Sequence, residues 1–147
     1  MTRYVFDTEA LIAYFYGEPG ASDVMRQLRA VENNEADGTI SHATATEMVY
    51  KIARLETGDP NHTSPADEEF EVGEQDVRIL RGYGVTIETP SWQTVARIKG
   101  GGGISLGDSY AAALALETDA TLVVGADPEF DDISADIDVY HIREEPV

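Results

Sequence analysis

The 147-residue sequence predicts an α/β fold in which helices flank a central, mostly parallel five-stranded sheet. Two observations predict it. Short apolar segments of strand character alternate with longer segments whose apolar residues recur at helical spacing, and turn formers separate them. Strands that alternate with helices are joined by right-handed crossovers, which makes the strands parallel. The length suits one hydrophobic core, so we expect residues 1–147 to form a single domain.

The first half of this pattern begins with a strand over residues 3–7, where three apolar residues precede an acid. Apolar residues at helical spacing predict a helix over residues 8–16 and a second one over residues 21–33. The sequence Gly17-Glu18-Pro19-Gly20 supplies the turn between them. A short strand over residues 37–41 follows.

Helical spacing resumes over residues 42–55, and a sparser stripe predicts another helix over residues 66–81. The segment between them, residues 58–65, is rich in turn formers and predicts a loop. Residues 85–87 predict a strand. We expect residues 89–91 to cap a short helix that continues through Arg97, with Pro90 near its first position.

The last third predicts a helix and two strands. Residues 107–118 form an alanine-rich segment that predicts a buried helix. The apolar residues of 120–124 and 137–142 predict the fourth and fifth strands.

The net charge of −18 is extreme for this length. Acids are scattered along the whole chain, and Lys51 and Lys99 are the only lysines. One interpretation is a protein that binds cations or basic partners. We favour the other, a halophilic proteome, in which acidic surfaces stay hydrated and salt screens their repulsion. At about 1 M salt the Debye length is only about 3 Å, so the charge argues weakly against nucleic-acid binding.

The chain has no cysteine, which excludes disulfides, thiolate zinc sites and a cysteine nucleophile. The three histidines show no zinc-ligand spacing. The N-terminus lacks the features of a signal peptide, and no apolar run approaches the roughly 18 residues of a membrane helix. We therefore expect a cytoplasmic protein with no membrane contact.

Four acids follow the predicted strands or begin the helices after them. Asp7 and Asp127 follow strands, Glu47 lies early in the helix after the second strand, and Asp108 opens the alanine-rich helix. In a parallel sheet all four can lie at the carboxyl edge of the strands, where ligands bind. Clustered carboxylates disfavour mutual ionisation, so we expect at least one raised pKa without a metal. A hard divalent cation would offset their repulsion.

Each acid also has an ordinary structural interpretation. Asp7, Asp108 and Asp127 could stabilise helix starts, where an acid satisfies free N–H groups. Glu47 and Lys51 form an i,i+4 pair worth only ~0.2–0.5 kcal/mol. Capping alone does not explain why all four converge on one edge.

The local sequences around these acids resemble the PIN-domain ribonucleases, particularly their small VapC-like toxin branch. The segments that carry the resemblance are Tyr4-Val5-Phe6-Asp7-Thr8, Thr46-Glu47, Ile104-Ser105-Leu106-Gly107-Asp108 and Val123-Val124-Gly125-Ala126-Asp127. They occur in the family's order over nearly the whole chain. The resemblance implies a three-layer PIN-like fold in which Asp7, Glu47, Asp108 and Asp127 hold one or two Mg²⁺ or Mn²⁺ ions.

The resemblance further implies an endoribonuclease toxin of a type II toxin–antitoxin system, with RNA as substrate, an antitoxin partner and a homodimer. Asp7, Asp108 and Asp127 are expected to bind the metal directly or through water, whereas Glu47 is either a ligand or orients the water. Thr8 could offer a hydroxyl. Candidate phosphate contacts are Lys51, Arg54, Arg97 and Lys99.

The chain departs from the family pattern at two positions near these acids. Gly125 stands where many members carry Thr or Ser, and Glu9 is an additional acid beside Asp7. Two other functions stay open. One is a haloacid-dehalogenase-like phosphatase, whose nucleophile would be Asp7, although Glu9-Ala10-Leu11 breaks that motif. The other is a non-catalytic module of the same fold that binds a partner.

Overall fold

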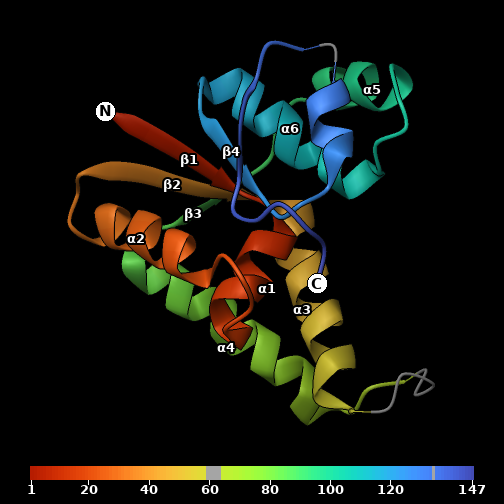
Figure 1. The fold of residues 1–147 in the computed structure, drawn as a ribbon. Helices are drawn as coiled ribbons and strands as arrows, with labels where there is room; N and C mark the ends of the chain where they lie inside the picture. The colour runs from red at the N-terminus through yellow and green to blue at the C-terminus, as the bar shows by residue number, and fades with distance from the viewer. Residues whose placement is uncertain (59–63, 134) are drawn as a thin grey trace.

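A computed structural model describes residues 1–58, 64–133 and 135–147 of the chain. The elements in that part follow the alternation that the sequence predicts (Figure 1). In chain order they are β1 (Thr2–Phe6), α1 (Thr8–Tyr16), α2 (Ala21–Glu32), β2 (Ala36–Ser41), α3 (His42–Glu56), α4 (Asp67–Tyr83), β3 (Thr86–Glu88), α5 (Trp92–Gly100), α6 (Leu106–Thr118), β4 (Thr121–Val124), the 3₁₀ helix η1 (Pro128–Asp132) and β5 (Asp138–His141).

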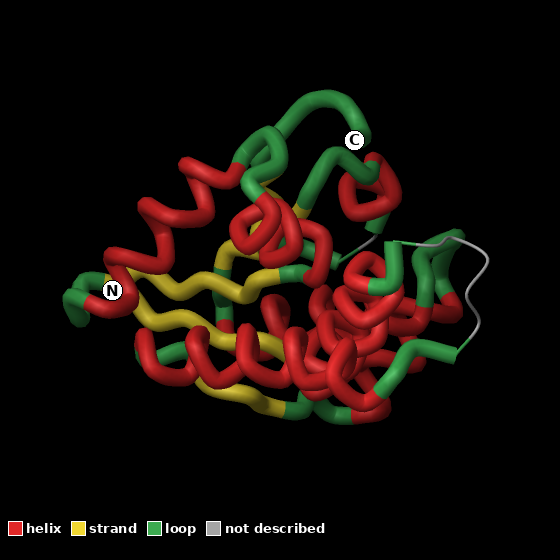
Figure 2. The backbone as a smooth tube through the Cα atoms, turned by 90° about the horizontal axis from the view of Figure 1, so that it is seen from below, coloured by secondary structure: helices red, strands yellow, loops and turns green. Residues whose placement is uncertain are grey.

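The five strands form one sheet in the order β3-β2-β1-β4-β5, and every neighbouring pair is parallel. The expectation of a mostly parallel sheet is thus confirmed in the stricter form of a fully parallel one. β1 lies at the centre, where Val5 pairs with Thr39 of β2 and with Leu122 of β4. The strands lie side by side in the view of Figure 2. Their carboxyl ends therefore meet at one edge.

Helices cover both faces of the sheet, which gives three layers. Phe6, Ile40 and Val123 belong to a core with residues of α1, α2, α3 and α4. Val5 and Leu122, one residue along the same strands, belong to a second core with α5 and α6. Successive strand residues point to opposite faces, so a strand buried on both sides reads as a continuous apolar run.

The structure corrects the predicted start and end of one helix. Ser91 is the N-cap of α5 and Pro90 precedes it, so Pro90 lies outside the helix instead of near its first position. The helix also continues past Arg97 to Gly100, because Gly101 N–H still donates to the Arg97 carbonyl at 3.1 Å. Most of the predicted loop, residues 59–63, lies outside the described residues.

The sequence did not predict η1, a five-residue 3₁₀ helix after β4. Within the described residues, no helix is both long and apolar enough to cross a membrane.

Candidate metal centre

Asp7 occupies the junction between the central strand and α1. Its backbone N–H donates to the Val123 carbonyl at 2.9 Å, which ties the residue to the end of β4. Asp7 is 3% exposed, its side chain makes no capping hydrogen bond, and Oδ1 is buried without a hydrogen-bond partner. Since buried carboxylates are costly unless paired, helix capping does not account for this residue.

Glu47 lies in α3, the helix that begins directly after β2. Ser41 caps this helix by accepting the Thr44 N–H at 2.9 Å. The predicted pair with Lys51 is present: Nζ lies 3.3 Å from Glu47 Oε2. Oε1, in contrast, is buried without a partner, and it lies where a Cβ at position 107 would be. Gly107 of α6 therefore makes room for the carboxylate.

Asp108 and Asp127 come together with a third acid that the sequence did not single out. Asp108 is the third residue of α6, whose N-cap is Ser105, and Asp127 caps η1 by accepting the Glu129 N–H at 2.9 Å. One carboxylate oxygen from each of Asp108, Asp127 and Glu129 lies within 4.8 Å of the others. Capping is therefore part of the role of Asp127. It also brings Glu129 to the cluster.

Electrostatic interactions connect this group to Asp7 and Glu47, which lie outside the 4.8 Å group. The pKa of Asp7 is raised well above its ordinary value, first by burial and then by the negative charge of Asp108, with smaller contributions from Glu47 and Glu9. Burial also raises the pKa of Asp108, and Glu47 and Asp127 add to the effect. The predicted raised pKa is thus confirmed for two of the acids. The charges of Glu47 and Asp127 thus act on Asp108, and those of Asp108 and Glu47 act on Asp7.

The chemistry of these residues fits a hard divalent cation. Mg²⁺ and Mn²⁺ favour oxygen ligands, and Mg²⁺ sites in proteins typically use one or two carboxylates together with water and phosphate oxygens. The unpartnered oxygens of Asp7 and Glu47 and the three converging oxygens around Asp108 supply such donors. A cation here would offset the repulsion that raises the pKa of Asp7.

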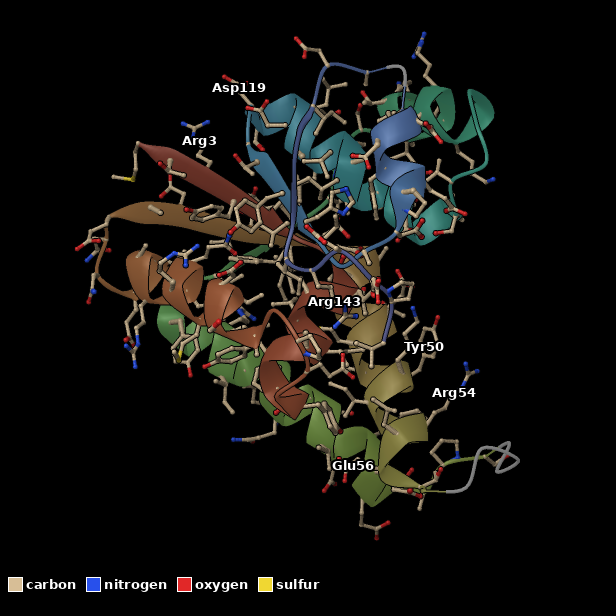
Figure 3. The ribbon with its side chains drawn as sticks, in the orientation of Figure 1. Arg3, Tyr50, Arg54, Glu56, Asp119 and Arg143 are labelled. Carbon is tan, nitrogen blue, oxygen red and sulfur yellow. The ribbon has the colours of Figure 1, made fainter. Side chains whose placement is uncertain are left out.

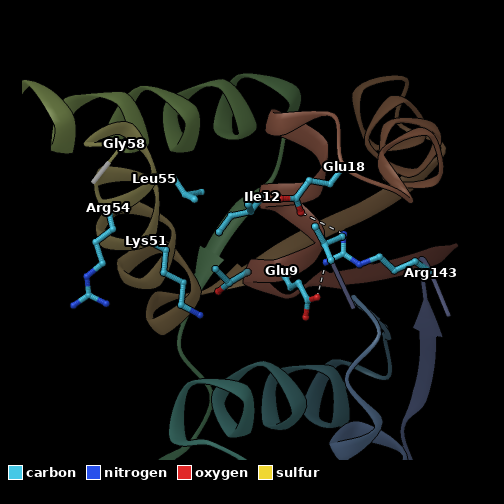
Figure 4. A pocket seen from close by; sticks show the side chains of 10 residues that line it. Glu9, Ile12, Glu18, Lys51, Arg54, Leu55, Gly58 and Arg143 are labelled. Atoms are coloured by element: carbon cyan, nitrogen blue, oxygen red, sulfur yellow. Dashed lines mark hydrogen bonds and ion pairs between the residues drawn. The ribbon is translucent and has the colours of Figure 1, made fainter. Parts of the chain in front are cut away.

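A cavity of about 680 Å³ lies between α1, α3 and the C-terminal segment (Figure 4). Thr8 and Glu9 line it near Asp7, and Lys51, Arg54 and Arg143 bring three positive charges to its walls. The other candidate phosphate contacts, Arg97 and Lys99, are exposed in the last turn of α5 and do not line this cavity.

Arg54 and Arg143 differ in how they are held. Arg54 stacks on Tyr50, with Cζ 4.8 Å from the ring centroid, and both extend outward from α3 (Figure 3). The Arg143 side chain is 6% exposed and is paired with Glu9 and Glu18. Arg54 is therefore available to a ligand, whereas Arg143 is fixed within the protein.

His141 supports the loop that carries Asp127. Its Nδ1 lies 2.9 Å from the Gly125 carbonyl oxygen, and its Nε2 lies 3.0 Å from both carboxylate oxygens of Asp131 in η1. The ring thus joins the end of β5 to both sides of the fourth acid. Only a histidine and an acid ten residues apart mark this contact in the sequence.

A family model for the PIN domain matches residues 4–136. The chain belongs to the PIN-domain family. This membership agrees with the resemblance of the four motifs and favours the nuclease interpretation over the haloacid-dehalogenase alternative. No curated protein matches the chain.

Solved structures of the same fold include VapBC complexes and FitAcB. VapBC2 from Rickettsia felis, bound to a DNA fragment from its promoter, matches with a TM-score of 0.66 at 15% identity, covering 95% of this chain and 98% of that chain. DNA-bound VapBC from Salmonella typhimurium matches at 0.62 and 16% identity, covering 97% and 100%. FitAcB from Neisseria gonorrhoeae matches at 0.60 and 20% identity, covering 95% and 97%.

The family model shows the family, the solved structures show the fold, and several of the structural neighbours are VapBC complexes. None of them supports a halophilic origin, which stays a prediction from the charge alone.

Proposed function

We propose that this chain is a Mg²⁺- or Mn²⁺-dependent endoribonuclease and the toxin of a type II toxin–antitoxin system. The observation that carries the proposal is the buried carboxylate oxygen of Asp7, which has no hydrogen-bond partner. The negative charges of Asp108 and Glu47 disfavour the ionised form of this carboxylate. Without a cation, burial of the Asp7 carboxylate and its repulsion by the neighbouring carboxylates would destabilise this PIN domain, and a bound cation would offset both effects.

In this mechanism Asp7, Asp108 and Asp127 hold the metal, directly or through water. An ion held by these residues would supply charge stabilisation at the phosphate and would lower the pKa of a water molecule. Glu47 is either a fourth ligand or orients that water. Lys51, 3.3 Å from Glu47, offsets part of the negative charge at this side of the centre.

The distribution of positive charge supports RNA as the substrate. The chain has only ten Lys and Arg residues, and three of them line the cavity that Thr8 and Glu9 border. Arg143 is occupied by Glu9 and Glu18, so Lys51 and Arg54 are the side chains that can reach phosphates. Arg and Lys contacts to phosphate position a nucleic acid without reading its sequence.

An antitoxin partner is the second part of the proposal. The structural neighbours from Rickettsia felis and Salmonella typhimurium were crystallised as VapBC complexes bound to DNA. We expect a small antitoxin-like protein to be encoded next to this chain and to form a stable complex with it on co-expression. We also expect the chain itself to be a homodimer, which light scattering would measure.

The decisive experiment is RNA cleavage with metal and chelator titrated. Cleavage should require Mg²⁺ or Mn²⁺, and Asp7→Asn, Asp108→Asn and Asp127→Asn should each remove most of it while circular dichroism shows an intact fold. Asp119→Asn is the matched control, because it removes the same charge from an exposed helix end. Cleavage by Asp7→Asn at the wild-type rate across the metal titration would refute the assignment.

The same assay separates the alternatives. Turnover of a generic phosphomonoester without RNA cleavage would indicate a phosphatase. A folded protein that binds the antitoxin but neither Mn²⁺ nor RNA would be a non-catalytic PIN-fold module.

A further inference from the structure

Glu9 and Gly125 fit together at the edge of the metal centre. A Cβ built at Gly125 would lie 2.5 Å from Oε1 and 2.6 Å from Oε2 of Glu9, so the Glu9 carboxylate fills the space of a side chain there. Gly125 does not belong to the glycines with positive φ. Its backbone therefore accepts any residue, and the space taken by Glu9 is what requires glycine.

Arg143 fixes the Glu9 carboxylate in this place. Its Nη2 lies 2.5 Å from Glu9 Oε1, and its Nη1 donates to Glu18 Oε1 at 3.3 Å and to the Pro19 carbonyl at 3.2 Å (Figure 4). The arginine thus joins the segment after β5 to the first turn of α1 and to the turn that follows this helix. The planar guanidinium holds carboxylates in a defined orientation, so Glu9 is fixed more firmly than an exposed glutamate.

The second carboxylate oxygen of Glu9 remains available. In the described part of the chain, the hydrogen bond of Glu9 uses Oε1, and the side chain is 38% exposed. The Glu9 carboxylate lies against Gly125, two residues before Asp127, and Glu9 lines the cavity together with Thr8, the residue that follows Asp7. A ligand with hydrogen-bond donors could therefore bind Oε2 on the same side as Asp7.

Thr8 gives an independent sign that a polar ligand binds here. Thr8 is 2% exposed and lines the cavity together with Glu9, yet its Oγ1 is buried without a hydrogen-bond partner. A buried hydroxyl without a partner costs about 1–3 kcal/mol. Asp7 Oδ1, the neighbouring residue's oxygen, is unpartnered as well. These atoms and Glu9 Oε2 suit the water ligands of a divalent ion.

We propose that Glu9, fixed by Arg143 and accommodated by Gly125, is a further carboxylate of the metal centre that accepts hydrogen bonds from the ion's water ligands. The proposal rests on the proposed metal-dependent function. Arg143 is in this role a positioning residue. Partners of this kind usually change metal affinity or activity by about 10- to 100-fold when they are removed.

The primary test is direct Mn²⁺ binding, measured by calorimetry or by electron paramagnetic resonance at constant KCl. Glu9→Gln keeps the size of the side chain and removes its charge, and it should raise the Kd for Mn²⁺ by about 10-fold or more. Glu18→Gln is the matched control. It removes the other carboxylate partner of Arg143 and should lower Tm while leaving the Kd within about twofold.

A second pair of variants tests the fit between Glu9 and Gly125. Gly125→Ser should displace the Glu9 carboxylate and weaken Mn²⁺ binding in the wild-type background. In the Glu9→Ala background the same substitution should cause no further loss, because the space is then vacant. Such non-additivity is expected for residues in contact, whereas distant, independent sites are usually additive.

The outcomes separate this inference from the proposed function. If Glu9→Gln binds Mn²⁺ with wild-type affinity, the role of Glu9 is refuted. If Asp108→Asn loses Mn²⁺ binding in the same experiment, the proposed metal centre itself still stands. If the wild-type chain does not bind Mn²⁺, or if Asp108→Asn binds it equally well, the proposed metal centre is refuted. The metal-dependent function and the role of Glu9 are then both refuted.

Discussion

Oε1 of Glu47 occupies the position that a Cβ at Gly107 would take, so that α3 and α6 meet at the carboxylate without a side chain between them. Gly107 is the second residue of α6, where alanine would favour the helix by about 1 kcal/mol. The glycine therefore lowers the stability of the helix, but it lets the Glu47 carboxylate pack against the residue that precedes Asp108.

The first prediction is that Gly107→Ala lowers Mn²⁺ affinity by about 10-fold while Tm changes by only a few degrees. The added methyl overlaps the end of a flexible side chain, which can swing toward solvent at little cost but then leaves the ion. Calorimetric Mn²⁺ titration and thermal melts measure the two effects.

Gly82→Ala is the control for this substitution. Gly82 lies inside α4 with open space where its Cβ would be, so alanine should raise stability by about 0.5–1 kcal/mol and leave Mn²⁺ binding unchanged. Equal Mn²⁺ affinities for Gly107→Ala and wild type would show that Glu47 is not at the ion.

The second prediction concerns pH in the metal-free protein. The pKa values of Asp7 and Asp108 are raised by burial and by neighbouring carboxylates. A raised folded pKa contributes stability below the unfolded value of about 4, and this stability is lost as pH rises through the folded value. With chelator at constant KCl, Tm should fall from about pH 5 toward 8, and Mg²⁺ should restore it.

Comparison of variants isolates the Asp7 contribution. Burial lowers the pKa of His141, but its contacts with Asp131 and the Gly125 carbonyl raise it more. The stability that protonated His141 contributes to the fold is therefore also lost as pH rises. This effect is common to wild type and Asp7→Asn. Metal-free Asp7→Asn should therefore melt higher than wild type at pH 8 and gain less from Mg²⁺, whereas Asp119→Asn should behave as wild type. A lower metal-free Tm with an unchanged Mg²⁺ increment would make Asp7 a purely structural residue.

The positions of these acids were predictable to different degrees. Asp7 and Asp127 follow strands whose apolar runs are plain in the sequence, and strand direction in a parallel sheet places them at one edge. Glu129 was not predictable, because a five-residue 3₁₀ helix leaves no periodic pattern. The hydrogen bond between Arg143 and Glu9 joins residues 134 positions apart, and only the folded chain reveals it.

Gly125 illustrates the same limit. The sequence shows an unusual glycine beside the fourth acid and an additional acid beside the first, but it does not show that one fills the space of the other. Their complementarity depends on the approach of α1 to the end of β4. That approach is a property of packing between distant segments.

The third prediction concerns salt. A chain with a net charge of −18 repels an anionic RNA at low ionic strength, and molar salt screens that repulsion. RNA cleavage should therefore increase from low salt toward molar KCl, which is opposite to the counterion-release trend of basic nucleic-acid binders. Circular dichroism in the same buffers distinguishes weak binding from unfolding. A well-folded enzyme that cleaves fastest at low salt would contradict the halophilic interpretation.

The last prediction is that Arg54→Gln raises KM for RNA several-fold and leaves both Mn²⁺ affinity and Tm near their wild-type values. Arg54 is exposed on the wall of the cavity and stacks on Tyr50, so it can contact a phosphate without belonging to the metal centre. Steady-state cleavage of a short RNA at saturating Mn²⁺ separates KM from kcat.

Arg78→Gln is the matched control for Arg54, because Arg78 is an exposed helical arginine that pairs with Glu74, four residues earlier in α4. If the effect of Arg54 depends on its location at the cavity and not on the net charge of the chain, removing the charge of Arg78 should leave KM unchanged. The salt dependence adds a second criterion. Removal of one phosphate contact should lower the slope of log KM against log salt by about one, whereas a change in net charge alone should affect both variants equally. Equal KM increases for the two arginine variants would show that RNA does not pass through this cavity.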